Sequence, residues 1–476
     1  MTDHRDPTIA VLERTLQHAV RYIGELDTAP VSATATLAEL RTRLGRALPA
    51  AGEDAVRVID DLVADSAGGH NSSASGRFFG WVIGGSLPAA LGADWLTSTW
   101  DQNAGIYACG PAVAVIEEVA GAWLKDVLAL PASASFAFVT GCQMAHVTAL
   151  AAARHALLQR RGWDVERDGL AGAPAIRILS STERHGTIDR AVRLLGLGQR
   201  SVVALPTGDD GRLAPRTLAD ALAHEPERPT IVLLQAGDLH IGAFDDFAAL
   251  IPIAHTAGAW VHVDGAFGLW AAASPTHRHL LRGVEMADSW ATDGHKWLNV
   301  PYDSGYAFVA DPAPHRASMS YWASYIVESE HARDALDWNP EFSRRGRGVA
   351  TYAALRELGR DGLRDLVDRC CRHAAAIVAG IGALPGAEVE WAPTLNQGLL
   401  RFRDPKPGAS EADHDRRTDD VAAKVLATGE ALLSNSTWRG RRCMRVSVVN
   451  WRTSEEDVRR TVAAVARVLG EWRGRS

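Results

Sequence analysis

Residues 260–297 read WVHVDGAFGLWAAASPTHRHLLRGVEMADSWATDGHKW, and the order of apolar runs and of the residues that end them indicates the fold class. It contains two short apolar runs, WVHVD and DSWATD, each followed directly by small or polar residues. Short runs separated by a helical length of chain are typical of neighbouring strands in a parallel sheet. Because ligands bind beyond the carboxyl ends of such strands, Asp264 and the pair His295-Lys296 are the first candidate site residues.

The same rhythm continues on both sides of this stretch. Five further runs bring the number of expected strands to seven: FAFVTG (136–141), IRILSS (176–181), SVVALP (201–206), TIVLLQAG (230–237) and GYAFVAD (305–311). Strands alternating with helices predict an α/β domain whose sheet is largely parallel and covered by helices. After about Tyr325 a helical region (349–380) precedes EVEWAP (388–393), GLLRFRD (398–404) and CMRVSVVN (443–450), which predicts a smaller α+β domain.

These changes of rhythm divide the chain into three parts. Residues 1–75 carry apolar side chains at helical spacing and end in a Gly/Ser-rich loop, so we expect an N-terminal helical arm packed on something else. Residues 76–325 form the predicted large domain, and residues 326–476 form the predicted small C-terminal domain.

Composition narrows the class of partner. With 476 residues, 47% hydrophobic, the chain can bury a large core, and its net charge of −7 comes without a basic block. We therefore expect a small-molecule partner and neither nucleic acid nor a membrane. The five cysteines lack CxxC spacing, and no export signal or membrane span is evident, which favours a cytoplasmic protein without disulfides or a metal site.

Asp264 stands where its strand ends and is followed by Gly265 and Ala266. A carboxylate at a nearly buried strand end costs several kcal/mol unless a cation meets it. The protonated ring nitrogen of a cofactor would be such a cation. A capped turn before the next helix explains Asp264 equally well, because Asp-Gly is a common turn dipeptide.

Lys296 follows His295 in an apolar, aromatic setting between Trp290 and Trp297. Desolvation there would lower the pKa of its amine, as a lysine that forms a Schiff base requires. A surface lysine is the ordinary alternative. The order of the residues favours function, since a strand-end Asp followed by a strand-end His-Lys can hold a cofactor ring nitrogen at one end and its aldehyde carbon at the other.

Two more places complete the predicted site. In VTGCQMAHVTALAAARHALLQRRG (139–162) a strand turns through Gly141 into a helix, whose first N–H groups and positive dipole end can bind phosphate. His185 follows another strand and could stack on a conjugated ring, although a lone histidine in a loop is more often simply solvated.

Taken in order, these motifs resemble the group II pyridoxal-phosphate (PLP) dependent amino acid decarboxylases, which have the aspartate aminotransferase fold (fold type I). The resemblance runs from about position 75 to the end of the chain. Besides Gly141 and His185, it rests on GRFFGWVIGGSLPAALGADWL (76–96), PAVAVIEEVAGAWL (111–124), AGDLHIGAFDDF (236–247), HVDGAFG (262–268), DGHKW (293–297), EFSRRGRGVATYAALRELGRDGL (341–363) and MRVSVVNW (444–451).

The resemblance implies roles for the residues that match. Lys296 would form the internal aldimine and later move protons, with His295 supporting the phosphate or the lysine. Asp264 would pair with the pyridinium nitrogen and keep the ring an electron sink. The remaining cofactor-binding residues would be Ala266 and His185 on the two ring faces, Gly141, Cys142 and Gln143 at the phosphate, and Asp238 close to the phenolate oxygen.

It also implies a substrate pocket and an assembly. Trp81, with Phe79 and Tyr107, would line the pocket in a segment that usually serves the neighbouring subunit, so we expect a homodimer with its active site at the interface. The implied reaction is decarboxylation of an L-amino acid through a quinonoid intermediate. The sequence does not identify which amino acid enters.

Three departures from the family bear on the reaction. Ala335 stands where a loop tyrosine protonates Cα in the family, and Tyr325 lies well before it, so the protonation could fall to Lys296 or His185, or oxygen or an electrophile could intercept the intermediate. Asp238 replaces a small Thr or Asn and could turn toward His240 or toward backbone amides. Gln143 and Met144 replace the usual hydroxyl and acid at the phosphate.

Two other readings remain open. The same constellation serves PLP-dependent carbon-carbon lyases, aldolases and aminotransferases. An aminotransferase would need a residue that grips the substrate α-carboxylate, for which Arg445 is the candidate. A non-catalytic PLP-fold binding protein is the second alternative, and the intact set of Asp264, His295 and Lys296 argues against it.

Overall fold

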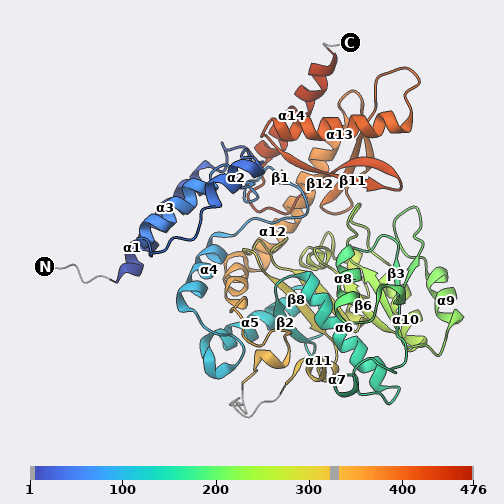
Figure 1. Ribbon diagram of the computed structural model, residues 1–476. Coiled ribbons are helices and arrows are strands. Elements are labelled where there is room, and N and C mark those ends of the chain that lie inside the picture. The colour runs from blue at the N-terminus through green and yellow to red at the C-terminus, as the bar shows by residue number, and fades with distance from the viewer. Residues whose placement is uncertain (1–5, 322–331, 474–476) are drawn as a thin grey trace.

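A seven-stranded sheet forms the centre of the molecule. The computed structural model describes residues 6–321 and 332–473 (Figure 1). The strand order is β2-β8-β7-β6-β5-β3-β4, and only β8 runs antiparallel to its neighbours. The strands are β2 (Ser135–Val139), β3 (Arg177–Ser181), β4 (Val202–Leu205), β5 (Thr230–Gln235), β6 (Trp260–Asp264), β7 (Ser289–Asp293) and β8 (Gly305–Val309). All seven predicted strands are confirmed.

Helices cover both faces of this sheet, because its central strands are apolar on both sides. Along β5, Ile231 and Leu233 pack into one cluster while Val232 and Leu234 pack into another. The helices of this region are α4 (Pro88–Trp100), α5 (Pro111–Val127), α6 (Cys142–Gln159), α7 (Val165–Asp168), α8 (Gly186–Leu194), α9 (Pro215–His224), α10 (Phe247–Thr256) and α11 (Pro312–Met319). Four of them begin at a proline, whose fixed φ suits the first helical position: α4, α5, α9 and α11.

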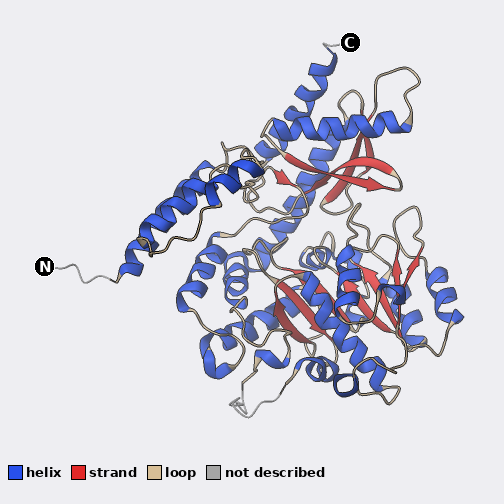
Figure 2. Ribbon diagram, in the orientation of Figure 1, coloured by secondary structure: helices blue, strands red, loops and turns tan. Residues whose placement is uncertain are grey.

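A second sheet follows toward the C-terminus (Figure 2). Its order is β1-β11-β12-β10-β9, formed by β1 (Phe78–Phe79), β9 (Ala387–Trp391), β10 (Gln397–Phe402), β11 (Leu432–Trp438) and β12 (Arg441–Ser447). Helices α12 (Gly348–Gly382), α13 (Glu411–Ala427) and α14 (Glu455–Arg473) accompany it. The sequence did not predict β11, because its residues 434–437 are Ser, Asn, Ser and Thr and give no apolar run.

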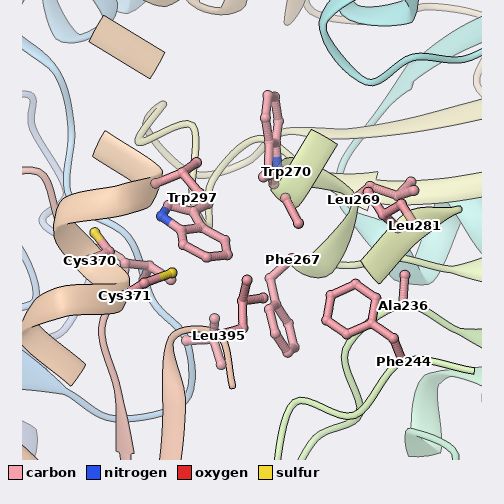
Figure 3. Close-up of a cluster of buried hydrophobic side chains, with 14 of the residues drawn as sticks. Ala236, Phe244, Phe267, Leu269, Trp270, Leu281, Trp297, Cys370, Cys371 and Leu395 are labelled. Carbon is pink, nitrogen blue, oxygen red and sulfur yellow. The ribbon is translucent and has the colours of Figure 1, made fainter. Parts of the chain in front are cut away.

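A cluster of buried hydrophobic side chains, part of which Figure 3 shows, includes residues of both sheets. Trp297, the residue after Lys296, is fully buried there, and Phe267 and Trp270 belong to the same cluster. From α12 the cluster receives Cys370 and Cys371. The burial of Trp297 fixes the backbone at Lys296, so the lysine is held by the core and not by a free loop.

Three N-terminal helices lie outside this core. They are α1 (Pro7–Glu25), α2 (Leu37–Leu44) and α3 (Ala55–Ser66), and none of their residues is buried. Figure 1 shows α1 and α3 side by side, projecting from the body of the molecule. Short 3-10 helices complete the secondary structure at Tyr107–Cys109, Gln199–Ser201, Gly268–Ala273, Arg278–Leu281, Val284–Met286 and Ala335–Asp337. The three-part division at 75/76 and 325/326 stays a prediction.

No helix in the described part of the chain combines the length and the apolar character that crossing a membrane requires.

Candidate active site

The carboxyl ends of the parallel strands open into a cavity of about 370 Å³. This is the edge of the sheet at which α/β proteins bind their ligands. Nine of the twelve site residues expected from the sequence line it: Trp81, Gly141, Cys142, Gln143, His185, Asp264, Ala266, His295 and Lys296. Residues more than 200 positions apart in the sequence thus meet at one place.

Asp264 is the last residue of β6 and is buried, with 7% of its surface exposed. Its Oδ1 accepts a hydrogen bond from the backbone N–H of Ala266 at 3.2 Å, and its Oδ2 lies 3.5 Å from Nε2 of His146 on α6. Burial acts to raise the pKa of this carboxyl, but the contact with His146 and the charge of Lys296 lower it below its usual range. Asp264 is therefore an anion at any physiological pH and can hold a proton donor placed in the cavity.

Lys296 follows β7, and its Nζ lies 3.2 Å from Oδ2 of Asp293. We expected desolvation to lower the pKa of this amine, and that expectation was wrong. Burial does act to lower the pKa of Lys296, but the carboxylate of Asp293, assisted by Asp264, raises it above its ordinary value. The amine is thus stored as an ammonium beside an acid, and it must lose a proton before it can act as a nucleophile.

The start of α6 also borders the cavity. Gly141 precedes the helix without a side-chain cap, and the N–H of Cys142 donates to Oδ1 of Asp293 at 2.6 Å. A Cβ at Gly141 would come within 2.9 Å of Cε1 of His295, so the close approach requires glycine. The side-chain nitrogen of Gln143 is buried and has no hydrogen-bond partner among the described residues. The N–H groups of the Gln143 side-chain amide are therefore available to an anion at the start of α6.

His185 and Ala266 also line the cavity. The backbone N–H of Thr187 donates to Nδ1 of His185 at 3.2 Å, which leaves Nε2 as the N–H of the neutral ring. Burial lowers the pKa of His185, with Asp264 acting in the opposite direction, so the imidazole is neutral near pH 7. A neutral imidazole can stack on a flat ligand without adding charge.

His295 packs against a neighbour that the sequence did not indicate. Its ring stacks on the ring of Tyr302, with centroids 4.2 Å apart and planes inclined by 22°. The N–H of Ser304 donates to Nδ1 of His295 at 3.1 Å, and Nε2 lies 3.5 Å from Oδ1 of Asp293. Tyr302 also lines the cavity, with 58% of its surface exposed, and partial burial together with Asp293 raises the pKa of its phenol. The cavity therefore holds a phenol that keeps its proton.

Asp238, Phe79 and Tyr107 do not line the cavity. Asp238 is turned toward backbone amides, accepting hydrogen bonds from the N–H groups of His240, Ile241 and Ala243 at 2.7, 3.2 and 2.6 Å. The ring of His240 instead contacts Oγ of Ser436 at 2.8 Å. Of the two partners considered for Asp238, the backbone is the one observed. Phe79 is buried in β1, and Tyr107 begins a 3-10 helix.

The structure also shows where Ala335 and Arg445 lie. Ala335 is buried in a 3-10 turn that packs on the segment before Tyr107, where the N–H of Leu336 donates to the carbonyl of Gly105. Tyr325 lies outside the described residues. Arg445 donates to the carbonyl of Leu239 at 2.6 Å and does not line the cavity, so nothing in its position supports an aminotransferase.

The sequence analysis missed Asp293 and His146, although a signal for both was present. Asp293 is the last residue of β7, as Asp264 is of β6, and the strand-end argument applies to both. His146 lies one helical turn after Cys142 and so shares its face of α6. It was overlooked because nothing in the sequence pairs α6 with β6.

Cys142, His146 and Asp264 place potential ligand atoms within 4.8 Å of one another. Burial and the nearby carboxylate of Asp264 raise the pKa of the Cys142 thiol well above its usual value. Nε2 of His146 lies 3.4 Å from Sγ of Cys142 and 3.5 Å from Oδ2 of Asp264, so the three side chains form one cluster of buried polar contacts.

The residues present fit pyridoxal phosphate. The cavity is lined by the start of a helix, a carboxylate that stays ionised and a lysine amine, and His185 and Ala266 also line it. The unpartnered N–H groups of Gln143 match a phosphate, and the anionic Asp264 matches a protonated ring nitrogen.

Comparison with known proteins gives the same picture. A family model described as the pyridoxal-dependent decarboxylase conserved domain matches residues 38–403. The aromatic-L-amino-acid decarboxylase of Bacillus atrophaeus is 26% identical over 447 residues, 92% of this chain and 90% of that protein. The L-2,4-diaminobutyrate decarboxylase of Rhizobium meliloti (strain 1021) is 28% identical over 391 residues, 80% of this chain and 75% of that protein.

The fold is likewise similar to solved structures. The crystal structure of Oryza sativa TDC with PLP and tryptamine superposes with a TM-score of 0.92 at 24% sequence identity, covering 99% of both chains. The predicted fold class is therefore confirmed.

Proposed function

Because this chain belongs to the pyridoxal-dependent decarboxylase family, we propose that it removes the α-carboxylate of an L-amino acid as carbon dioxide, with Asp264 and Lys296 as the two residues that the reaction needs most. The observation that carries the residue assignment is their meeting in one cavity, with the anionic Asp264 on β6 and the amine of Lys296 after β7. The protein is a PLP-dependent lyase.

Pyridoxal phosphate, when bound, supplies a conjugated ring that accepts the electron pair left by the departing carboxylate. Asp264 would hold the proton on the ring nitrogen, and Lys296 would hold the aldehyde carbon. The start of α6 and the side chain of Gln143 would hold the phosphate. His185 and Ala266 would confine the ring from its two faces.

Proton movements fall to groups that already touch one another. Asp293 lies 3.2 Å from Nζ of Lys296 and is positioned to hold the proton that the amine must release. Lys296 can afterwards return a proton to the substrate Cα. Tyr302 is a further donor in the cavity, because its raised pKa keeps the phenol protonated. Ala335 cannot serve, since it carries no acidic group.

We propose an aromatic or other uncharged side chain on the substrate. The cavity walls include the rings of Trp81, Phe267 and Tyr302. Among the residues that the structure describes, no arginine lines the cavity, so a substrate with a second carboxylate would find no bidentate partner among them.

We also propose that the protein acts as a homodimer in the cytoplasm. Apolar side chains of α1 that are only partly covered by the described chain include Leu12, Leu16 and Val20, which are 43%, 51% and 60% exposed. Exposed apolar faces of this kind mark protein interfaces. The five cysteines are free thiols, in keeping with a reducing compartment.

The first experiment is a visible absorption spectrum of the purified enzyme, followed by carbon dioxide release from a panel of L-amino acids. We expect an absorption band of the bound cofactor that is lost in Lys296→Ala and kept in Lys406→Ala, a matched change at an exposed lysine. Carbon dioxide evolved from aromatic amino acids supports the proposal. A band without carbon dioxide from any amino acid would remove decarboxylation and leave a lyase or aminotransferase reaction.

Ala335 favours a second candidate activity that the same assay can detect. Without a phenol at this position, oxygen could intercept the reaction after carbon dioxide leaves and yield an aldehyde, ammonia and hydrogen peroxide in place of an amine. We therefore add a peroxide assay. Amine equal to the carbon dioxide released supports simple decarboxylation, whereas peroxide equal to the carbon dioxide supports the oxidative route.

A further inference from the structure

A chain of buried polar side chains runs away from the active site behind Asp264. Trp260, His262 and Asp264 alternate along β6 and therefore share one face of that strand. Helix α6 covers this face and adds His146, and Ser289 joins from the first position of β7. His146, His262 and Ser289 have no exposed surface.

The contacts along this chain are continuous. The indole Nε1–H of Trp260 donates to Oγ of Ser289 at 2.9 Å, and the same hydroxyl lies 2.9 Å from Nδ1 of His262. Nε2 of His262 lies 2.9 Å from Nδ1 of His146, and Nε2 of His146 lies 3.5 Å from Oδ2 of Asp264. The rings of the two histidines meet edge to face, with planes inclined by 85°.

The far end of the chain sets the direction of every hydrogen bond in it. An indole N–H can only donate, so Oγ of Ser289 accepts from Trp260. The buried hydroxyl then satisfies its own proton by donating to Nδ1 of His262, the remaining polar contact that the described residues give it. Burial lowers the pKa of His262 to about 3, so this ring is neutral and carries its single proton on Nε2.

The same direction of hydrogen-bond donation continues from His262 to the active site. Nε2–H of His262 donates to Nδ1 of His146, which places the proton of His146 on Nε2, facing Asp264. The same nitrogen lies 3.4 Å from Sγ of Cys142. Asp264 thus meets an N–H at Oδ2, which favours the carboxylate, while its Oδ1 accepts from the backbone N–H of Ala266.

We propose that Trp260, Ser289, His262 and His146 form a hydrogen-bond relay that fixes Asp264 in position as a carboxylate and so sets how firmly the active site holds a proton on the cofactor ring nitrogen. His146 and His262 are positioning residues in this scheme, because they act through Asp264. The proposal rests on the cofactor site described above and deepens it.

The other titratable groups facing Asp264 lie on different elements. They are Cys142 on α6, His185 before α8, and Asp293 and Lys296 at the end of β7. All of them adjoin the cavity, whereas His262 and Ser289 do not line it. Substitutions at His262 and Ser289 therefore test the relay without removing a group that contacts the cofactor.

The test compares His262→Met, which removes the N–H that His146 accepts, with His262→Gln, whose side-chain nitrogen can replace Nε2. The readouts on the cofactor-loaded enzyme are the apparent pKa of the visible band, kcat and KM. If Asp264 holds the proton on the ring nitrogen less firmly, the cofactor ring carries less positive charge. The charge then lowers the pKa of the other protonated group conjugated with the ring by a smaller amount. In His262→Met we therefore expect the apparent pKa to rise by about 0.5 or more and kcat to fall about tenfold, with KM within about twofold.

His262→Gln is expected to stay within about threefold of the wild type in kcat, with an unshifted apparent pKa. Val261→Ala, on the opposite face of β6, controls for disturbance of the strand and is expected to lower only Tm. The relay is refuted if His262→Met keeps the wild-type pKa and kcat at equal cofactor occupancy, or if the Gln variant behaves like the Met variant. If His262→Met does not fold, Ser289→Ala decides by the same readouts, with a smaller rise expected.

A wild-type enzyme without a cofactor band or carbon dioxide release would instead contradict the proposed function itself, so the two failures are distinguishable.

Discussion

At the residue scale, the active site is a set of opposed charges held in place by burial. The lowered pKa of Asp264 keeps this carboxylate ionised across the working range, and its stabilising interactions are lost only in acid, as the pH falls through that lowered value. The raised pKa of Lys296 has the opposite sign. Its ion pair with Asp293 stabilises the fold below the ordinary lysine pKa of about 10.4 and is lost as the pH rises through the raised value.

The raised pKa of Lys296 predicts how the rate of cofactor attachment depends on pH. Only the neutral amine of Lys296 can attack an aldehyde. The rate at which the cofactor attaches to cofactor-free enzyme should therefore increase about tenfold for each pH unit between pH 7 and 9. In Asp293→Asn the pKa of Lys296 should fall, and attachment at pH 7 should be about tenfold faster or more. The measurement is the growth of the visible band after mixing. The Asn side chain can still accept from the N–H of Cys142, and an unchanged rate would contradict the role assigned to Asp293.

At the element scale, a buried ion pair ties the helical layer to the sheet. Arg344, just before α12, contacts Glu117 on α5 through two hydrogen bonds of 2.7 and 3.0 Å and also donates to the carbonyl of Phe138 on β2 at 2.8 Å. Both side chains are almost fully buried. Removing one partner leaves the other charge uncompensated in the interior, which costs far more than losing an exposed pair.

We therefore expect Glu117→Ala to lower the free energy of unfolding by about 3–5 kcal/mol. Asp361→Ala removes one partner of the exposed pair with Arg364 on α12 and should change it by less than about 0.5 kcal/mol. Urea unfolding of both variants beside the wild type measures the difference. Equal effects of the two substitutions would show that Arg344 and Glu117 do not hold these elements together.

At the scale of the whole molecule, the three helices of the N-terminal arm bury none of their residues against the described part of the chain. Helices α1 and α3 contact each other, yet none of their residues is buried, and their apolar side chains face outward. Covering such surface is the ordinary reason for oligomerisation, and each Å² of apolar area removed from water contributes about 25 cal/mol. A second copy of the chain is the partner that the proposed homodimer supplies.

The double variant Leu16→Glu and Val20→Glu tests this assembly. Two charges in an apolar interface should convert the dimer to monomer at micromolar concentration, as measured by sedimentation velocity, and should lower decarboxylation if the active site needs both subunits. Leu194→Glu, at an exposed apolar residue of α8, is the matched control and should remain dimeric. A double variant that sediments like the wild type would place the interface elsewhere.

By itself, the sequence determined the seven strands of the large sheet and the strand-end positions of Asp264 and Lys296, because apolar runs and the residues that end them are local features. It did not reveal β11, whose polar residues 434–437 form a strand because β12 pairs with them. Only the tertiary structure decided that the pKa of Lys296 is raised, since Asp293 reaches its amine in space, and that Asp238 is turned toward backbone amides. Only the packing of α6 on β6 brought His146 to Asp264, because electrostatic effects depend on distances between side chains that no local pattern encodes.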